Sequence, residues 1–201
     1  MKTIGEKLLT GKILPKLESP GYCRAMVFRA YEFSRFLTKI NVANWLCTGS
    51  VLGFVRNRKV IPGDFDIDLA IWHDDVKKIH ELPDKIKEKF KIFPWYLDKG
   101  LNWYHEKKIA VDNGNLPIDI CEYVAQGNIT YPVADPRMTC EKRFFTDLRK
   151  IKFYGCDFYI PRDSGAYLNA VYGPGWKKTI TRREYVGKFF VGKFWHTYHG
   201  L

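Results

Sequence analysis

Apolar and polar positions alternate along the chain in a way that divides it into helical and extended segments. Between residues 21 and 40, apolar side chains recur at steps of four and three, which is typical of an amphipathic helix. Residues 44–47 form a short apolar run that ends at a Thr-Gly-Ser turn. We expect a strand over this run, then a turn, then a short helix over residues 51–56.

A second set of extended segments follows the break at Pro62 and Gly63. Residues 65–72 alternate as a strand does, with apolar side chains at the odd positions. Residues 73–75 offer an N-cap for one helix that runs through about residue 90. Further strands are predicted over residues 91–97, 101–105, 107–111 and 116–124, and a turn-like segment over residues 126–139.

The last predicted elements are a hairpin and a helix. Two extended runs, residues 148–154 and 157–161, flank Gly155 and Cys156 and predict the hairpin. Asp163 or Ser164 is a suitable cap for a helix that ends at Tyr172 and is closed by a Gly-Pro-Gly sequence. A helix, a strand–turn–helix unit and a run of strands together indicate an α/β or α+β protein, with helices packed on a mixed β-sheet.

Composition supports one globular unit. The 201 residues are 46% hydrophobic and 16% aromatic, which is enough for one well-buried core. We expect a single domain over residues 1–201, with a core of about residues 22–178 and a basic, aromatic C-terminal segment of residues 179–201.

The sequence also predicts a cellular location. No apolar run approaches the roughly 18–20 residues that span a bilayer, and residues 1–19 lack the features of a signal peptide. The five cysteines form no C-x-x-C pair, which favours free, buried thiols in a reducing compartment. We expect a cytoplasmic protein.

The positive charge is concentrated near the C-terminus. The formal net charge is +11, with 20 basic and 17 acidic side chains in residues 1–136 but 13 basic and 5 acidic in residues 137–201. Such a bias indicates an anionic partner, which can be a nucleotide, a nucleic acid, an anionic glycan or a membrane surface. The charge does not choose among them.

Asp66 and Asp68 are the strongest candidates for chemistry. Two positions apart on a strand, they direct both carboxylates to one face, with Cα atoms roughly 7 Å apart. Paired carboxylates repel each other and lose hydration beside a core strand unless a cation lies between them. Mg²⁺ binds carboxylate oxygens together with substrate phosphates, so the pair predicts a metal and a phosphate. The alternative is an exposed strand end with two solvated aspartates.

Other residues extend this candidate site. Asp119 is an acid in an apolar, strand-like run, and a neighbouring strand can bring it beside the pair, as in two-metal phosphoryl transfer. Gly49 and Ser50 follow a strand and open a helix, so their backbone N–H groups are candidates for holding a phosphate. Arg56 would extend from that helix toward the same anion.

The order of these motifs resembles the LicD/fukutin branch of the polymerase-β-type nucleotidyltransferase superfamily. That branch typically shows Gly-Thr-Leu-Leu-Gly-x-x-Arg, then Ile-Pro and an Asp-rich D-x-D-x-D strand, and residues 48–56 and 60–69 are similar to this pattern. A second block, residues 159–161 leading to residues 167–176, is similar to the Pro, Leu-containing helix and Tyr-Gly-x-x-Trp with which the branch often ends. The resemblance covers about residues 40–178.

The resemblance implies a nucleotidyltransferase-like mixed sheet with flanking helices. It implies transfer of a substituted phosphate, such as phosphocholine or ribitol phosphate, from a CDP-linked donor to a hydroxyl of a glycan or lipid-linked glycan. It also implies Mg²⁺, with Mn²⁺ as a substitute, held by Asp64, Asp66 and Asp68, with Asp119 as a metal ligand or base. Two alternatives are transfer of NMP from an NTP to RNA, protein or a small molecule, and a non-catalytic RNA-binding module.

The C-terminal segment carries further candidates. Its basic and aromatic residues alternate, which suits glycan phosphates, a membrane interface or, with less support, nucleic acid. The alternative is a helix whose aromatic side chains pack on the core. His196 and His199 have a spacing that can bind a metal, but a surface position in the tail is favoured.

Overall fold

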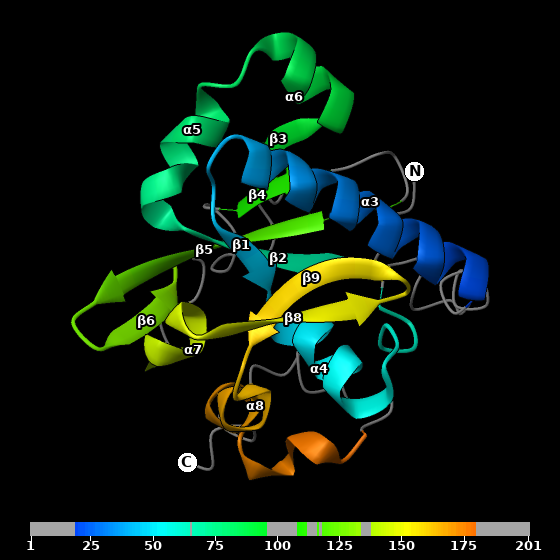
Figure 1. Cartoon of the computed structure of the whole chain (residues 1–201), viewed down its shortest axis with the longest axis vertical. Helices are drawn as coiled ribbons and strands as arrows, with labels where there is room; N and C mark the ends of the chain where they lie inside the picture. Colours follow the sequence, from blue (N-terminus) through cyan, green and yellow to red (C-terminus); the bar gives the residue numbers. More distant parts are fainter. Residues whose placement is uncertain are drawn as a thin grey trace, which may run out of the picture.

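A mixed β-sheet with helices packed against it forms the centre of the molecule (Figure 1). The computed structural model describes residues 19–64, 66–95, 108–111, 116, 118–133 and 138–179. The strands are β1 (Asn44–Leu46), β2 (Ile67–Trp72), β3 (Ile92–Trp95), β4 (Lys108–Val111), β5 (Ile118–Gln126), β6 (Ile129–Pro132), β7 (Cys140–Glu141), β8 (Leu148–Phe153) and β9 (Cys156–Pro161). The helices are α3 (Pro20–Lys39), α4 (Thr48–Asn57), α5 (Val76–His80), α6 (Asp84–Phe90), α7 (Arg143–Thr146) and α8 (Ser164–Tyr172), with two 3-10 helices, η1 (His73–Asp75) and η2 (Pro174–Lys177). The predicted fold class is confirmed.

The sheet has the order β1-β2-β5-β4-β3, and β6 pairs with β5 and β7. Its two central strands, β2 and β5, run parallel, whereas β1 and β4 pair with them in antiparallel fashion. On β2 the side chains of Ile67, Leu69 and Ile71 are almost fully buried, as the alternation of residues 65–72 predicts. β2 begins at Ile67, so Asp66, which the prediction includes in the strand, lies just before it.

Helix α3 begins at Pro20 for two local reasons. The Ser19 hydroxyl oxygen accepts a hydrogen bond from the Tyr22 N–H, and Pro20 at the first position has no N–H to satisfy. The buried side chains of α3 recur at helical spacing: Cys23, Met26, Val27, Ala30, Phe33 and Leu37. The predicted helix over residues 21–40 is therefore confirmed.

Two predicted segments are wrong. In place of the single helix expected through residue 90, the structure has three short elements, η1, α5 and α6. Pro83 has no backbone N–H, so it interrupts the helical hydrogen bonds after α5. The turn-like segment of residues 126–139 includes a hairpin, in which Gly127 adopts a φ of 59° between β5 and β6. The strand predicted over residues 101–105 lies outside the described residues.

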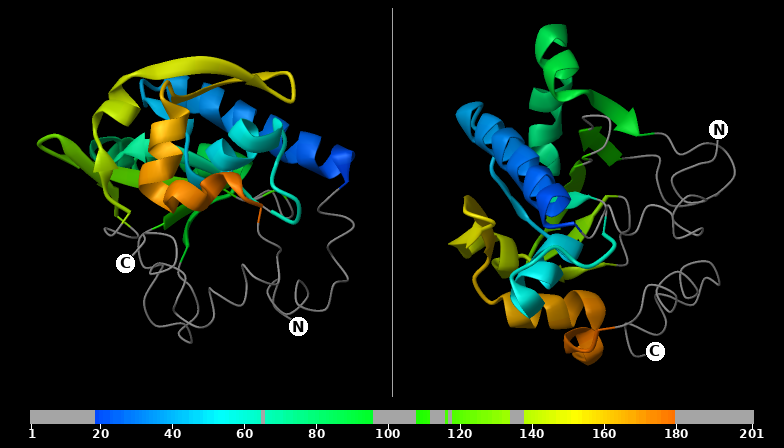
Figure 2. Two further views of the ribbon diagram at one scale, coloured as in Figure 1. Left: turned by 90° about the horizontal axis from the view of Figure 1, so that it is seen from below. Right: turned by 90° about the vertical axis from the view of Figure 1, so that its right-hand side faces the viewer.

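The β8–β9 hairpin forms a second, two-stranded sheet, as predicted. It packs against α3 and β1, and the left view of Figure 2 shows it arching over α3. Helix α8 follows, with Asp163 as its N-cap, and packs against α4. The predicted caps at both ends of α8 are confirmed, since Gly173 follows its last residue with a φ of 74°.

One hydrophobic cluster connects these elements. The rings of Trp45, Tyr123, Phe145 and Tyr167 pack against one another within it. All five cysteines are free thiols and four of them are buried, as expected. None of the described helices is both long and apolar enough to cross a membrane. The division into a core and a C-terminal segment stays a prediction, because residues 180–201 lie outside the described part of the chain.

Candidate active site

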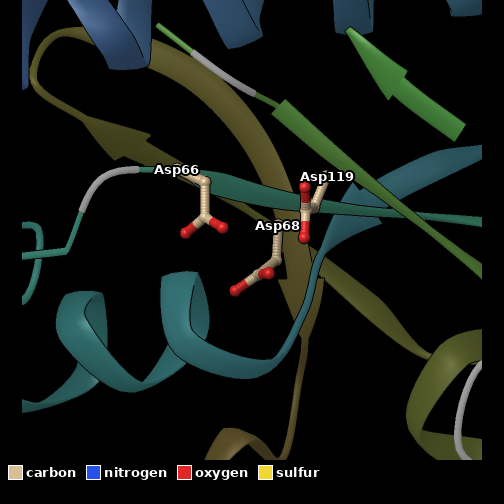
Figure 3. A group of neighbouring side chains, drawn as sticks. All are labelled: Asp66, Asp68 and Asp119. Atoms are coloured by element: carbon tan, nitrogen blue, oxygen red, sulfur yellow. The ribbon is translucent and has the colours of Figure 1, made fainter. Parts of the chain in front are cut away.

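Three aspartates converge at one end of the central strands. Asp66, Asp68 and Asp119 each offer a carboxylate oxygen, and these oxygens all lie within 4.8 Å of one another. Figure 3 shows Asp66 and Asp68 directed toward α4, with Asp119 beside Asp68. Asp119 is buried and the other two are half-buried. The structure therefore brings together the three residues predicted to be catalytic.

The register of the sheet explains this convergence. Strands β2 and β5 pair in parallel with Asp68 opposite Asp119, so both side chains leave the same face of the sheet. Asp66 lies just before β2 rather than on it, but two residues from Asp68 it directs its carboxylate to the same group. On the other face, Ile67, Leu69 and Ile71 of β2 and Ile118 and Ile120 of β5 are buried, which fixes the register.

Ser50, near the start of α4, and Asp68 exchange two hydrogen bonds. The Ser50 backbone N–H donates to Oδ2 of Asp68 over 3.2 Å, and the Asp68 backbone N–H donates to the Ser50 hydroxyl oxygen over 2.9 Å. The sequence predicts a phosphate as the anion at this helix N-terminus. In the structure the anion bonded to Ser50 is the Asp68 carboxylate, and phosphate binding by Gly49 and Ser50 stays a prediction.

Gly49 lies close to two carboxylates, so a side chain at this position would make a tight contact. A Cβ atom there would lie 3.0 Å from Oδ2 of Asp68 and 3.4 Å from Oδ2 of Asp64. The absence of a side chain thus lets the start of α4 approach both carboxylates closely. Asp64 lies beside Gly49 and outside the group of three converging carboxylates, and its role as a fourth metal ligand stays a prediction.

Arg56 has a different environment from the one predicted. It lies seven residues after Gly49 in α4, about 10 Å further along the helix axis. Its guanidinium donates to the backbone carbonyls of Trp176 and Lys178 and so ties α4 to the chain after α8. Its role as a phosphate ligand stays a prediction.

The candidate site predicted from the sequence does not include two residues that lie near it in the structure, Tyr167 and Cys47. The Tyr167 hydroxyl accepts a hydrogen bond from the Thr48 N–H over 3.0 Å, although the two residues are 119 positions apart. Burial raises the pKa of the Tyr167 hydroxyl well above its usual value, so it stays protonated. Burial also raises the pKa of the Cys47 thiol, with further contributions from the neighbouring Cys121 thiol and the Asp68 carboxylate. The similarity of the Tyr167 block to the end of the LicD pattern was the only signal for Tyr167.

The cluster has the chemistry of a site for a hard divalent cation. Three carboxylates at these distances repel one another and are partly or fully removed from water. A cation with oxygen ligands, such as Mg²⁺ or Mn²⁺, would offset that repulsion. His196 and His199 lie outside the described residues.

Comparison with known proteins defines the class. A family model described as LicD/FKTN/FKRP, nucleotidyltransferase domain, matches residues 41–163, well over half of the chain. This range includes Asp66, Asp68 and Asp119. The matched range is therefore a nucleotidyltransferase domain. More closely, the chain belongs to the LicD/FKTN/FKRP family.

Individual relatives share between 26% and 32% sequence identity with this chain over the aligned residues. An uncharacterised protein of Rickettsia typhi is 32% identical over 146 residues, which cover 71% of this chain and 43% of that protein. An uncharacterised protein of Rickettsia prowazekii is 27% identical over 147 residues, covering 71% and 51% of the two chains. Ribitol 5-phosphate transferase FKRP of Mus musculus is 26% identical over 151 residues, covering 69% and 29%. The chain thus spans about half, or less, of the length of these relatives.

Among solved structures, the lincosamide antibiotic adenylyltransferase LnuA, with lincomycin bound, is similar at a TM-score of 0.48 and 12% sequence identity. The similarity covers 83% of this chain and 96% of that one.

Proposed function

We propose that this chain is a metal-dependent transferase that moves a substituted phosphate from a CDP-linked donor to a hydroxyl group of a glycan. The clustering of Asp66, Asp68 and Asp119 within the range matched by the family model carries this proposal. The name of one relative, ribitol 5-phosphate transferase, supports a polyol phosphate as the transferred group.

The three aspartates fit Mg²⁺, with Mn²⁺ as a substitute. Their carboxylate oxygens are the ligands that these ions prefer, and three ligands leave positions for oxygens of a substrate phosphate. When bound, the ion would neutralise the charge of the donor diphosphate and of the leaving nucleotide. Asp64, which lies beside Gly49, stays a predicted further ligand.

The chain's own residues have two tasks in this reaction. Ser50 and Gly49 hold the start of α4 against Asp68, which fixes the orientation of that carboxylate. Asp119, or another aspartate of the cluster, would accept the proton of the acceptor hydroxyl. The hydroxyl oxygen then bonds to the phosphorus of the substituted phosphate, the bond between that phosphorus and the CMP oxygen breaks, and CMP leaves. Positioning and charge provide most of such catalysis.

The acceptor is proposed to be a glycan or a lipid-linked glycan. The basic, aromatic segment of residues 179–201 would face this anionic acceptor or a membrane, and its residues 180–201 lie outside the described part of the chain. The cytoplasmic location, with peripheral contact to a membrane, stays a prediction with it.

The proposal is tested by the identity of the released nucleotide. The full chain is incubated with Mg²⁺ and, in separate reactions, with CDP-ribitol, CDP-glycerol, CDP-choline and the four NTPs, and CMP and pyrophosphate are measured. We expect CMP from one CDP-linked donor. Asp68→Asn should reduce its release by at least about 100-fold. The exposed Asp74→Asn, in η1, is the matched control and should be as active as the wild type.

Other outcomes reject the proposal in distinct ways. Pyrophosphate release from an NTP in place of CMP would show nucleotidyl transfer, the alternative chemistry of the same fold. If neither product forms and nucleotides with Mg²⁺ do not raise the melting temperature, the assigned site is wrong.

A further inference from the structure

Helix α4 begins in an unusual way. Its first residue, Thr48, has a φ of 35°, a value that β-branched residues rarely adopt. The side chain of the N-cap residue, Cys47, accepts no capping hydrogen bond from a backbone N–H of the helix. Because the first N–H groups of a helix have no partners within it, the start of α4 depends on groups from elsewhere in the fold.

Two distant side chains provide these partners. The Tyr167 hydroxyl on α8 accepts from the Thr48 N–H over 3.0 Å. Two residues further on, the Asp68 carboxylate accepts from the Ser50 N–H over 3.2 Å. The same turn of α4 is thus held by a buried tyrosine on one element and by a candidate metal ligand on another.

We propose that Tyr167 is a positioning residue for the metal site. Its hydroxyl holds Thr48 in the left-handed conformation, and this conformation directs the Ser50 N–H at Asp68 and keeps the Gly49 backbone beside it. The proposal rests on the proposed function, because it takes Asp68 to be a metal ligand.

Packing alone does not account for a tyrosine at this position. The Tyr167 ring is fully buried, with its centre 5.9 Å from that of Phe144 and 5.4 Å from that of Phe145. A phenylalanine would fill the same space without burying a polar group. The hydroxyl accepts a hydrogen bond from the half-buried Thr48 N–H, which would lose this partner in a phenylalanine variant.

A matched pair of variants separates positioning from general stability. Tyr167→Phe removes the hydroxyl bonded to Thr48. Tyr154→Phe removes a hydroxyl that accepts the Val60 N–H over 3.4 Å, the same kind of bond beyond the other end of α4. Mn²⁺ affinity is measured by isothermal titration calorimetry on the full chain, and folding by thermal unfolding. We expect Tyr167→Phe to weaken Mn²⁺ binding about tenfold, as removal of an outer-shell group does, and Tyr154→Phe to leave the Kd unchanged.

A second substitution tests the conformation itself. Glycine adopts a positive φ without the penalty that a Cβ atom causes. Thr48→Gly combined with Tyr167→Phe should therefore bind Mn²⁺ more tightly than Tyr167→Phe alone. If Tyr167→Phe does not fold and the double variant does, that result supports the same role.

Two results would overturn the proposal, and they are distinguishable. Equal Kd values for Tyr167→Phe and Tyr154→Phe, or no recovery in the double variant, would reject the positioning role and leave the metal site intact. A wild-type chain that binds no Mn²⁺ would reject both the positioning role and the proposed function.

Discussion

Replacing Gly49 with alanine should damage the metal site while leaving the fold stable. The new Cβ atom would lie 3.0 Å from Oδ2 of Asp68 and 3.4 Å from Oδ2 of Asp64, so the Asp68 carboxylate must move by tenths of an ångström. Asp68 can move only by disturbing its bond from the Ser50 N–H. Because metal–ligand distances stay within about 0.2 Å of their preferred values, we expect Mn²⁺ affinity to fall at least about tenfold.

The stability of the same variant should change little. Alanine favours a helix over glycine by up to about 1 kcal/mol, which offsets the cost of the close contact in the metal-free protein. Gly53, in the same helix, is the matched control. A Cβ there would lie 2.5 Å from the Lys59 carbonyl oxygen and 3.1 Å from the Ile61 nitrogen, and backbone atoms cannot rotate away. We expect Gly53→Ala to lower the free energy of unfolding by about 1–3 kcal/mol.

Urea unfolding of the metal-free proteins and calorimetric titration with Mn²⁺ measure the two effects separately. The expected pattern is a Gly49→Ala protein that is stable and binds metal weakly. A Gly49→Ala protein that binds Mn²⁺ as tightly as the wild type, or that loses as much stability as Gly53→Ala, would refute the reasoning.

Three further predictions follow from individual contacts. Asp68→Asn removes one of three close negative charges, so the metal-free variant should unfold at a higher urea concentration than the wild type. Mg²⁺ should no longer stabilise this variant. Unchanged stabilisation by Mg²⁺ would contradict the role of Asp68 as a metal ligand. Arg56→Ala removes the donor to the Trp176 carbonyl and should lower the free energy of unfolding by about 1–3 kcal/mol, whereas an unchanged urea midpoint would show that this contact adds nothing. Burial raises the pKa of the Cys47 thiol and of the Tyr167 hydroxyl, so as the pH rises the unfolded chain loses these protons before the folded chain does. The free energy of unfolding should therefore be at its full value below about pH 8.5 and fall as the pH rises above it. A urea midpoint that stays constant between about pH 8 and 11 would exclude this linkage.

Most elements could be predicted because their cause is local. Helix α3 follows from apolar spacing and from Ser19 and Pro20 at its start, and α8 follows from its Asp163 cap. The missed break before α6 is also local, because Pro83 removes a backbone donor whatever the surroundings. Gly127 likewise allows the tight turn between β5 and β6 that the sequence-based prediction did not include.

The aspartate cluster could be predicted only in part. The spacing of Asp66 and Asp68 directs both to one face, and Asp119 is conspicuous as an acid within an apolar run. Their meeting depends on the parallel register of β2 and β5, which pairs residues 51 positions apart. No local pattern determines which strands become neighbours, so the sequence indicated the residues and the sheet brought them together.

Contacts between distant segments could not be predicted from spacing. The bond from the Thr48 N–H to Tyr167, like the bonds from Arg56 to the carbonyls of Trp176 and Lys178, joins α4 to chain more than 100 residues further on. Such contacts depend on how α8 packs against α4. This packing is why Arg56 contacts the carbonyls that follow α8.

The central claim is that Asp66, Asp68 and Asp119 hold a divalent cation. Electron paramagnetic resonance of Mn²⁺, titrated into the wild type and into Asp119→Asn, measures this most directly. We expect bound Mn²⁺ in the wild type that Mg²⁺ displaces, and no such signal in a folded Asp119→Asn protein. Equal Mn²⁺ binding by the two proteins would contradict the account.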